Sequence, residues 1–280
     1  MAFGRDSHWA EQLIQAQLPD GSWGPFHSMA KGSSLTTERA LRRLEYLGFT
    51  GEDEVIRRAL DYIRTCREGT SVIPDRVEVT HDWGLFTSMM FSAWLRRYTD
   101  SDEPANAFAL RWKRVLETAF ASGAYSDSSY RAAYEAEFGL RPRGARFVSF
   151  VSFYQVSLLA NLLSPEAEQA MFEYLLHCEE GIYYIYGKPV RTPPQVFASR
   201  ETVQWLMAVE LLARYTRCRG QLAFATDYLL AHQEPDGCWD LSPAAKDGIA
   251  LPLSDSWRKP EDRRRDCTDW ISRILNTIQN

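Results

Sequence analysis

The sequence lacks the features that mark several large classes of protein. No apolar run approaches the roughly 18 residues that a membrane-spanning helix needs, and the first residues lack the apolar core of a signal peptide. The formal net charge of −5 offers no basic surface for phosphates, so we expect no nucleic acid partner. These absences predict a cytoplasmic protein without a transmembrane segment.

Cysteine is scarce and scattered. The chain has five cysteines in 280 residues, and no two of them form a CxxC pair. An odd number without metal-ligand spacing is typical of a reduced protein rather than of a disulfide framework or a zinc site. We therefore expect no cysteine-built metal centre; the five positions are Cys66, Cys178, Cys218, Cys238 and Cys267.

What the sequence does contain is an internal repeat. The segment Gln17-Leu-Pro-Asp-Gly-Ser-Trp23 near the start matches Gln233-Glu-Pro-Asp-Gly-Cys-Trp239 near the end, and three weaker copies lie between them. The glycines that follow each helical stretch fall at positions 21, 69, 123, 181 and 237. A repeat of about fifty residues indicates an architecture in which one supersecondary unit recurs along the chain.

Each unit has the pattern of two helices. The stretch before each glycine is amphipathic, and the stretch after the following loop carries apolar or small residues over more of its circumference. We expect outer helices over roughly 8–18, 54–64, 105–121, 165–177 and 220–233, and inner helices over roughly 36–48, 82–98, 146–163, 199–216 and 267–278.

Closing these hairpins into a ring is the economical way to bury the inner helices, because an open stack would cover them on one side only. No segment shows sustained two-residue alternation, although residues 181–187 could form a short hairpin. The sequence therefore predicts an all-α fold, an (α/α) toroid or barrel of about five to six helix hairpins, as a single domain over residues 1–280.

The repeated motif resembles the QW-type repeat, Gln-x-x-x-Asp-Gly-x-Trp, of squalene and oxidosqualene cyclases. Related repeats occur in class II diterpene cyclases and in protein prenyltransferase β subunits, so the chain resembles members of the terpenoid cyclase and protein prenyltransferase toroid superfamily. The resemblance implies an apolar central cavity that binds a linear isoprenoid. It implies no cofactor, apart from Mg²⁺ if the substrate is a prenyl diphosphate, and it leaves room for a second protein subunit.

A second, shorter resemblance concerns the last repeat. The stretch Arg265-Asp266-Cys267-Thr268-Asp269-Trp270 is similar to the Asp-Cys-Thr-Ala-Glu stretch of oxidosqualene cyclases until Asp269. The resemblance implies that Asp266 is a general acid that starts cyclisation by protonating the substrate, with Cys267 as its hydrogen-bonding neighbour. From the residues alone, Asp266 could instead cap the last inner helix, as polar groups do at the other inner helices. The Asp-x-Cys spacing of the prenyltransferase zinc site is absent, so no metal site is expected.

Two further candidates open the second inner helix. Asp82 is a candidate catalytic residue and His81 a candidate substrate contact, because in a toroid both face the same cavity mouth as Asp266. Aromatic residues of the inner helices and of the 181–187 loop are candidate substrate contacts. Their π faces could stabilise a carbocation, or they could be ordinary core. These residues are Trp83, Phe86, Phe150, Tyr184, Trp205 and Trp270.

Three functions follow from this reading. The first is a terpenoid cyclase-like domain that binds a linear isoprenoid and protonates it from Asp266. The second is a toroid without catalysis that binds a hydrophobic ligand or a partner subunit. The third is a carbohydrate-active (α/α) barrel, for which carboxylates such as Glu38 and Glu201 would have to lie together with Tyr183.

Overall fold

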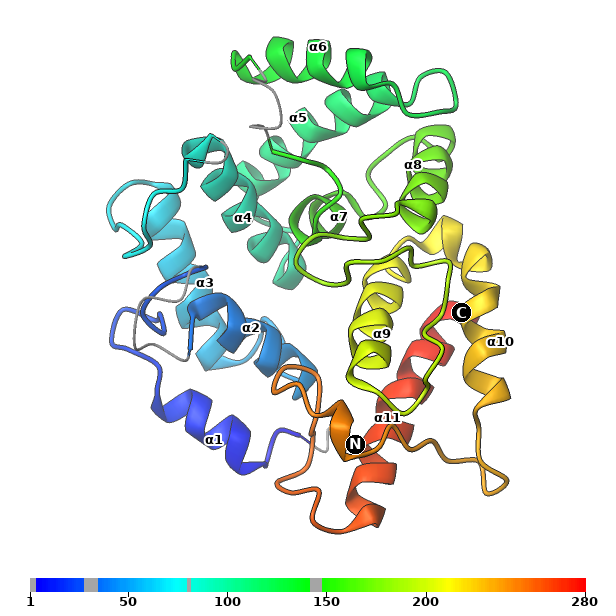
Figure 1. Ribbon diagram of the computed structural model, residues 1–280. Helices are drawn as coiled ribbons and strands as arrows, with labels where there is room; N and C mark the ends of the chain where they lie inside the picture. Colours follow the sequence, from blue (N-terminus) through cyan, green and yellow to red (C-terminus); the bar gives the residue numbers. More distant parts are fainter. Residues whose placement is uncertain (1–3, 28–34, 80–81, 142–147) are drawn as a thin grey trace.

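The computed structural model describes residues 4–27, 35–79, 82–141 and 148–280 (Figure 1). Within them the prediction of an all-α fold is confirmed, because they contain no β-strand and only two isolated bridges, Ser152 with Tyr183 and Ile182 with Tyr186. The α-helices there are α1 His8–Gln15, α2 Thr37–Tyr46, α3 Glu54–Arg67, α4 Trp83–Tyr98, α5 Glu103–Ala119, α6 Asp127–Phe138, α7 Phe153–Leu159, α8 Pro165–His177, α9 Arg200–Leu212, α10 Ala223–Ala231 and α11 Pro260–Gln279. Two short 3₁₀ helices span Thr216–Leu222 and Pro243–Ala245.

The contrast between one-sided and all-round burial that the repeat predicts is clear in α3 and α7. Outer helix α3 buries the face that carries Val55, Ile56, Ala59, Leu60 and Ile63, and its exposed residues are the charged Glu54, Arg57 and Asp61. Inner helix α7, in contrast, is buried along its whole length. Apolar side chains on every face are expected only of a helix that neighbours surround, so α7 belongs to the centre of the molecule.

Three helices differ clearly from the sequence prediction, and the first is α7, which spans Phe153–Leu159 where an inner helix over roughly 146–163 was expected. Helix α6 was not expected; Ser126 caps its start by accepting from the backbone N–H of Ser129, and Gly139 ends it with a left-handed backbone at φ 66°. Helix α11 begins at Pro260, well before residue 267, because proline and acidic residues suit a first turn. Asp266 therefore lies inside α11, and the alternative that it caps this helix is wrong.

Both sharp copies of the motif form the same local structure. The indole Nε1 of Trp23 donates to a carbonyl of α1 at 2.8 Å, and that of Trp239 donates to a carbonyl of α10 at 2.7 Å. The backbone N–H of each tryptophan donates to a threonine hydroxyl of the next inner helix, Thr37 or Thr268, at 3.0 Å. The motif thus ties an outer helix to the inner helix that follows it.

The first and last repeats are in contact. The indole Nε1 of Trp9 donates to the carbonyl of Ser254 at 3.1 Å, in the loop before α11. Farther along, the guanidinium of Arg43 on α2 donates to two carbonyls of the 249–252 segment, and the rings of Tyr46 and Trp270 meet edge to face at 5.7 Å between centroids. A closed ring requires such contacts, but the complete toroid stays a prediction.

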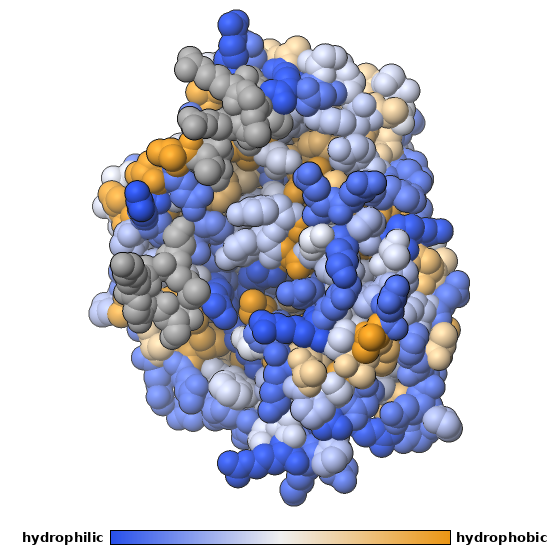
Figure 2. All heavy atoms as spheres, viewed as in Figure 1, coloured by the Kyte–Doolittle hydropathy of each residue, from blue (hydrophilic) through white to orange (hydrophobic). Residues whose placement is uncertain are grey.

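No helix in the described ranges is long and apolar enough to cross a membrane. In the space-filling view of Figure 2, hydrophobic side chains form small separate groups on a mostly hydrophilic face.

Candidate functional site

A buried carboxylate lies at the start of the first inner helix. Glu38, in the first turn of α2, has no exposed surface. Its Oε2 accepts a hydrogen bond from the hydroxyl of Tyr154 on α7 at 2.9 Å, and its Oε1 accepts one from the indole Nε1 of Trp94 on α4 at 3.3 Å. Three inner helices thus contribute to one polar cluster, which is costly to bury unless its members pair with one another.

His27 completes this cluster. Its Nδ1 lies 3.0 Å from Oε2 of Glu38 and 2.8 Å from the hydroxyl of Tyr154. The loop that carries it is held by Asp75, whose carboxylate accepts from the backbone N–H groups of Phe26 at 2.5 Å and of His27 at 2.7 Å. The other ring nitrogen, Nε2, has no hydrogen-bond partner among the described residues, so it is the one position on this ring still able to bind a ligand.

The electrostatic surroundings favour a proton on His27. Burial acts to lower the pKa of the imidazole, but the hydrogen bond and the charge of Glu38 outweigh it, and Glu78 and Asp75 add to the effect. The pKa of His27 is therefore raised above its usual value. Burial, then the charge of Glu38, raises the pKa of Tyr154 well above normal, so that its hydroxyl remains a donor.

Aromatic side chains surround the cluster. The ring of His27 meets Phe86 at 5.4 Å and Tyr184 at 5.1 Å between centroids. Tyr184 has a left-handed backbone at φ 75°, which is uncommon for a bulky residue and marks a position under constraint. Its ring also lies under the guanidinium of Arg42, 5.4 Å from the centroid. We call His27, Glu38, Arg42, Tyr154 and Tyr184 the acid–base cluster.

The predicted catalytic residue Asp266 lies in a different setting. Its side chain is 1% exposed, and its Oδ2 accepts four hydrogen bonds at 2.7–2.9 Å. The donors are the backbone N–H groups of Leu253 and Ser254, the hydroxyl of Ser254 and the indole of Trp257. Its Oδ1 is buried and has no partner among the described residues. Four donors on one oxygen are suited to a carboxylate anion that anchors a loop.

The other two predicted catalytic residues, Cys267 and Asp82, also lie in structural settings. The thiol of Cys267 is fully buried, and burial chiefly raises its pKa to about 12, which keeps it protonated and unreactive. Asp82 is the N-cap of α4, and its carboxylate accepts from the backbone N–H of Leu85 at 2.8 Å. Its neighbour His81 lies outside the described residues.

The predicted aromatic contacts divide into three groups. Phe86 and Tyr184 belong to the surroundings of His27, and Trp83 packs on Phe86 at 5.8 Å between centroids. Trp205 is fully buried and donates to the carbonyl of Val190 at 2.8 Å, as a core residue does. The remaining two, Phe150 and Trp270, are buried elsewhere, the first beside a cavity and the second against Glu210 on α9.

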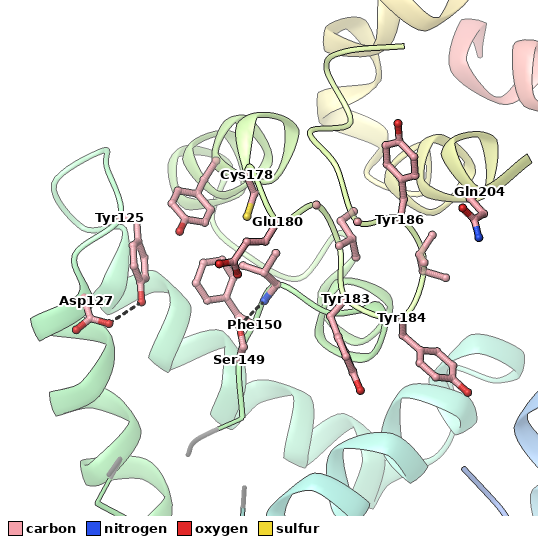
Figure 3. Close-up of a pocket in the computed structure, with 16 residues that line it drawn as sticks. Tyr125, Asp127, Ser149, Phe150, Cys178, Glu180, Tyr183, Tyr184, Tyr186 and Gln204 are labelled. Carbon is pink, nitrogen blue, oxygen red and sulfur yellow. Dashed lines mark hydrogen bonds between the residues drawn. The ribbon is translucent and has the colours of Figure 1, made fainter. Parts of the chain in front are cut away.

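A cavity of about 750 Å³ is lined in part by Tyr184 (Figure 3). Its floor and walls come from the loops around Tyr125 and Phe150, from the end of α8 and from the 181–187 segment. That segment is pinned to the start of α7, because Tyr183 donates its N–H to Val151 and accepts from Phe153, both at 3.1 Å. The volume is in the range of small-molecule sites.

The described residues show no metal centre, since they hold no group of three or more His, Cys, Asp or Glu side chains placed to share an ion. Comparison of the chain with family models, with curated proteins and with solved structures found no match. The resemblance to terpenoid cyclases therefore rests on the sequence motifs alone, and function has to be argued from the geometry of these sites.

Sequence reasoning missed most of the acid–base cluster. The sequence singled out Glu38 only among the carboxylates of a carbohydrate-active barrel, and it indicated no catalytic role for His27. One signal was available: Thr37-Glu38 in the first repeat corresponds to Thr268-Asp269 in the last, since each threonine accepts from a motif tryptophan. An acidic residue follows that threonine in both repeats, and in the first repeat it is Glu38, whose carboxylate is fully buried.

Proposed function

We propose that this chain is a terpenoid cyclase-like enzyme whose proton donor is His27, backed by Glu38 and Tyr154, in place of Asp266. One observation carries the proposal: a histidine with a raised pKa lies beside aromatic rings and has its Nδ1 hydrogen-bonded to a buried carboxylate, while its Nε2 has no partner among the described residues. Holding Nδ1 in this way orients the imidazole for proton transfer at Nε2.

The strength of this acid limits the substrate. An imidazolium with a pKa above the usual value of about 6.5 is too weak an acid to protonate an isolated carbon–carbon double bond. It is well matched to an oxygen atom that gains negative charge as a C–O bond breaks. The substrate class we propose is therefore an isoprenoid that carries an oxygen function, such as an epoxide, rather than a plain hydrocarbon.

The aromatic surroundings support the same proposal. When a C–O bond opens, the carbon that it leaves develops positive charge, which the π faces of Phe86 and Tyr184 can stabilise. Trp83, which packs on Phe86 and is half-buried, extends this aromatic surface outward. No metal or cofactor is part of the proposal.

The test is turnover of an isoprenoid epoxide. Purified protein is incubated with a linear terminal epoxide such as oxidosqualene and, separately, with the corresponding alkene; products are separated by gas chromatography and mass spectrometry. We expect a cyclised or hydrated product from the epoxide alone. Replacing the proton donor should reduce the rate by a factor of about 10²–10⁴ in His27→Asn, and Tyr154→Phe should have a smaller effect.

Glu168→Gln is a matched control, because Glu168 is also a fully buried carboxylate but lies away from the cluster, near Arg217. It should keep the activity that Glu38→Gln loses. Full activity in His27→Asn with loss in Asp266→Asn would refute His27 as the acid and restore the role that the sequence motif implies.

One observation favours a second candidate, a toroid that binds a hydrophobic ligand without turning it over. Both oxygens of Glu38 are already hydrogen-bonded, and His27 is only 9% exposed. Mass spectrometry of lipid extracted from the purified protein distinguishes the two, since a binder would retain unchanged isoprenoid and an enzyme would release product.

A further inference from the structure

The cavity next to Tyr184 has an unusual lining. Six aromatic rings and two carboxylates face it or form its rim, and none of its described lining residues is a lysine or an arginine. The aromatic residues are Tyr125, Phe150, Tyr174, Tyr183, Tyr184 and Tyr186, and the carboxylates are Asp127 and Glu180. In Figure 3, Phe150 and Glu180 lie between Tyr125 on one side and Tyr183 on the other.

Three of these rings form one aromatic wall. The centroids of Tyr125, Phe150 and Tyr174 lie 5.0–5.5 Å from one another, and the rings are tilted by 41–48°. Opposite them, Tyr183 is 58% exposed, a large apolar surface for a side chain at the rim of a cavity. The π face of such a ring carries partial negative charge and attracts cations.

Several aromatic rings of this protein, including Tyr184 in the cavity lining, lie under its own cations. Arginine guanidinium groups lie 4.6–5.4 Å from the centroids of Phe49, Phe138, Phe153, Tyr184 and Phe224. No cation from the described residues lies over Tyr125, Phe150, Tyr174 or Tyr183. Four of the six rings that line this cavity are thus without a positive charge from the described residues.

The two carboxylates are not equivalent. Asp127 is paired with Arg131 at 2.6 Å and accepts from the hydroxyl of Tyr125 at 3.3 Å. Glu180 has neither a hydrogen bond nor an ion pair among the described residues, and it comes directly before the 181–187 segment that forms the rim. The exposed carboxylate of Glu180, next to aromatic rings over which no described cation lies, has the charge and position of a counter-ion.

We propose that this cavity binds an organic cation, a quaternary ammonium group held by Tyr125, Phe150, Tyr174 and Tyr183 with Glu180 as its counter-ion. A quaternary ammonium group needs no hydrogen-bond acceptors, and aromatic rings with a nearby carboxylate are the surroundings that recognise it. A volume of about 750 Å³ accommodates the group together with the chain attached to it. This inference does not depend on the proposed proton transfer at His27.

The probe is choline, compared with 3,3-dimethylbutan-1-ol, which has the same shape without the charge. Isothermal titration of the parent protein should detect choline binding with a Kd in the millimolar range or below, on the order of 1 mM, and at least about tenfold weaker binding of the neutral alcohol. Flotation with phosphatidylcholine vesicles separates the two sources of the group: co-flotation identifies a lipid headgroup, and choline binding without co-flotation identifies a free small molecule.

The variants Glu180→Gln and Tyr183→Leu should each weaken choline binding by about fivefold or more. Glu179→Gln is the matched control, because Glu179 is the adjacent exposed glutamate and does not line the cavity. Glu38→Gln should also bind choline normally, so failure of the acid–base proposal is distinguishable from failure of this one. Equal binding of the neutral alcohol, unchanged binding in Glu180→Gln, or no choline binding would overturn the proposal.

Discussion

The first and last repeats of the chain share a motif but use it in different surroundings. In both, the motif tryptophan ties the outer helix to a threonine on the next inner helix. In the first repeat the inner helix continues with Glu38, which gathers side chains from three other elements. In the last, Asp266 binds donors that lie 9 to 13 residues before it. One motif thus supports a site in one repeat and a local anchor in the other.

The two repeats differ most at the glycines of the motif, Gly21 and Gly237, both of which have a left-handed backbone. At Gly21 (φ 92°) a Cβ atom would lie 2.2 Å from the carbonyl oxygen of Arg58 on α3, whereas at Gly237 (φ 83°) nothing lies closer than 3.8 Å. Gly21→Ala should lower the free energy of unfolding by about 4 kcal/mol, through backbone strain and a clash. Gly237→Ala should cost about 1 kcal/mol, through strain alone. Urea unfolding of both variants checks this.

Equal losses in the two variants would contradict the idea that the first motif is packed against its neighbouring helix and the last is not. Truncating the Arg58 side chain to alanine should not restore the stability lost in Gly21→Ala, because the clash is with the backbone of Arg58 rather than with its side chain.

The second prediction concerns the anchor. Asp266→Asn replaces an anion that accepts four hydrogen bonds with a neutral amide, and we expect the free energy of unfolding to fall by about 3 kcal/mol. Asp262→Asn on the same helix is the control; Asp262 is partly exposed and paired with Arg265, so it should change stability by less than about 1 kcal/mol. Thermal and urea unfolding at neutral pH measure both.

Unchanged stability in Asp266→Asn would mean that the four hydrogen bonds contribute little. If loss of product formation accompanied it, the general-acid role from the sequence motif would be the better account of Asp266.

The fold was more accessible from the sequence than the site was. Helix periodicity and the recurring Asp-Gly-x-Trp turn are local, so they placed most helices within a few residues; α6 was missed although Ser126 and Gly139 are ordinary start and stop signals. The acid–base cluster depends on contacts such as Tyr154 with Glu38, 116 residues apart. Nothing in local patterning specifies which residues at the starts of different inner helices will meet.

The third prediction is that the pairing of His27 with Glu38 in the first repeat makes stability depend on pH. The pKa of His27 is raised in the folded state, so its contribution to stability is fully present below the unfolded pKa of about 6.5 and is lost as the pH rises through the folded value. Glu38→Gln removes the largest raising influence and leaves burial, which lowers this pKa. The parent should therefore exceed Glu38→Gln in stability by more at about pH 5.5 than at about pH 9, with each pKa unit worth about 1.4 kcal/mol.

Urea unfolding at the two pH values measures this difference, and an NMR titration of the imidazole signals follows the pKa of His27 directly. Asp266→Asn serves as the comparison, because no histidine is bonded to Asp266. A stability gap for Glu38→Gln that does not change with pH would contradict a coupling between Glu38 and the charge on His27.

The smallest expected effect on stability comes from replacing the glutamine at the start of each motif. Gln17 donates from its side-chain amide to the carbonyls of Gly21 and of Val55 on α3, both at 2.9 Å. Gln233 donates only to the carbonyl of Gly237, at 2.8 Å, and is exposed. Gln17→Ala should therefore lower the free energy of unfolding by about 1.5 kcal/mol and Gln233→Ala by about 0.5 kcal/mol. Because Val55 belongs to the next repeat, the extra loss at Gln17 measures how far the first motif joins neighbouring repeats, and equal losses would show that both motifs act only within their own turn.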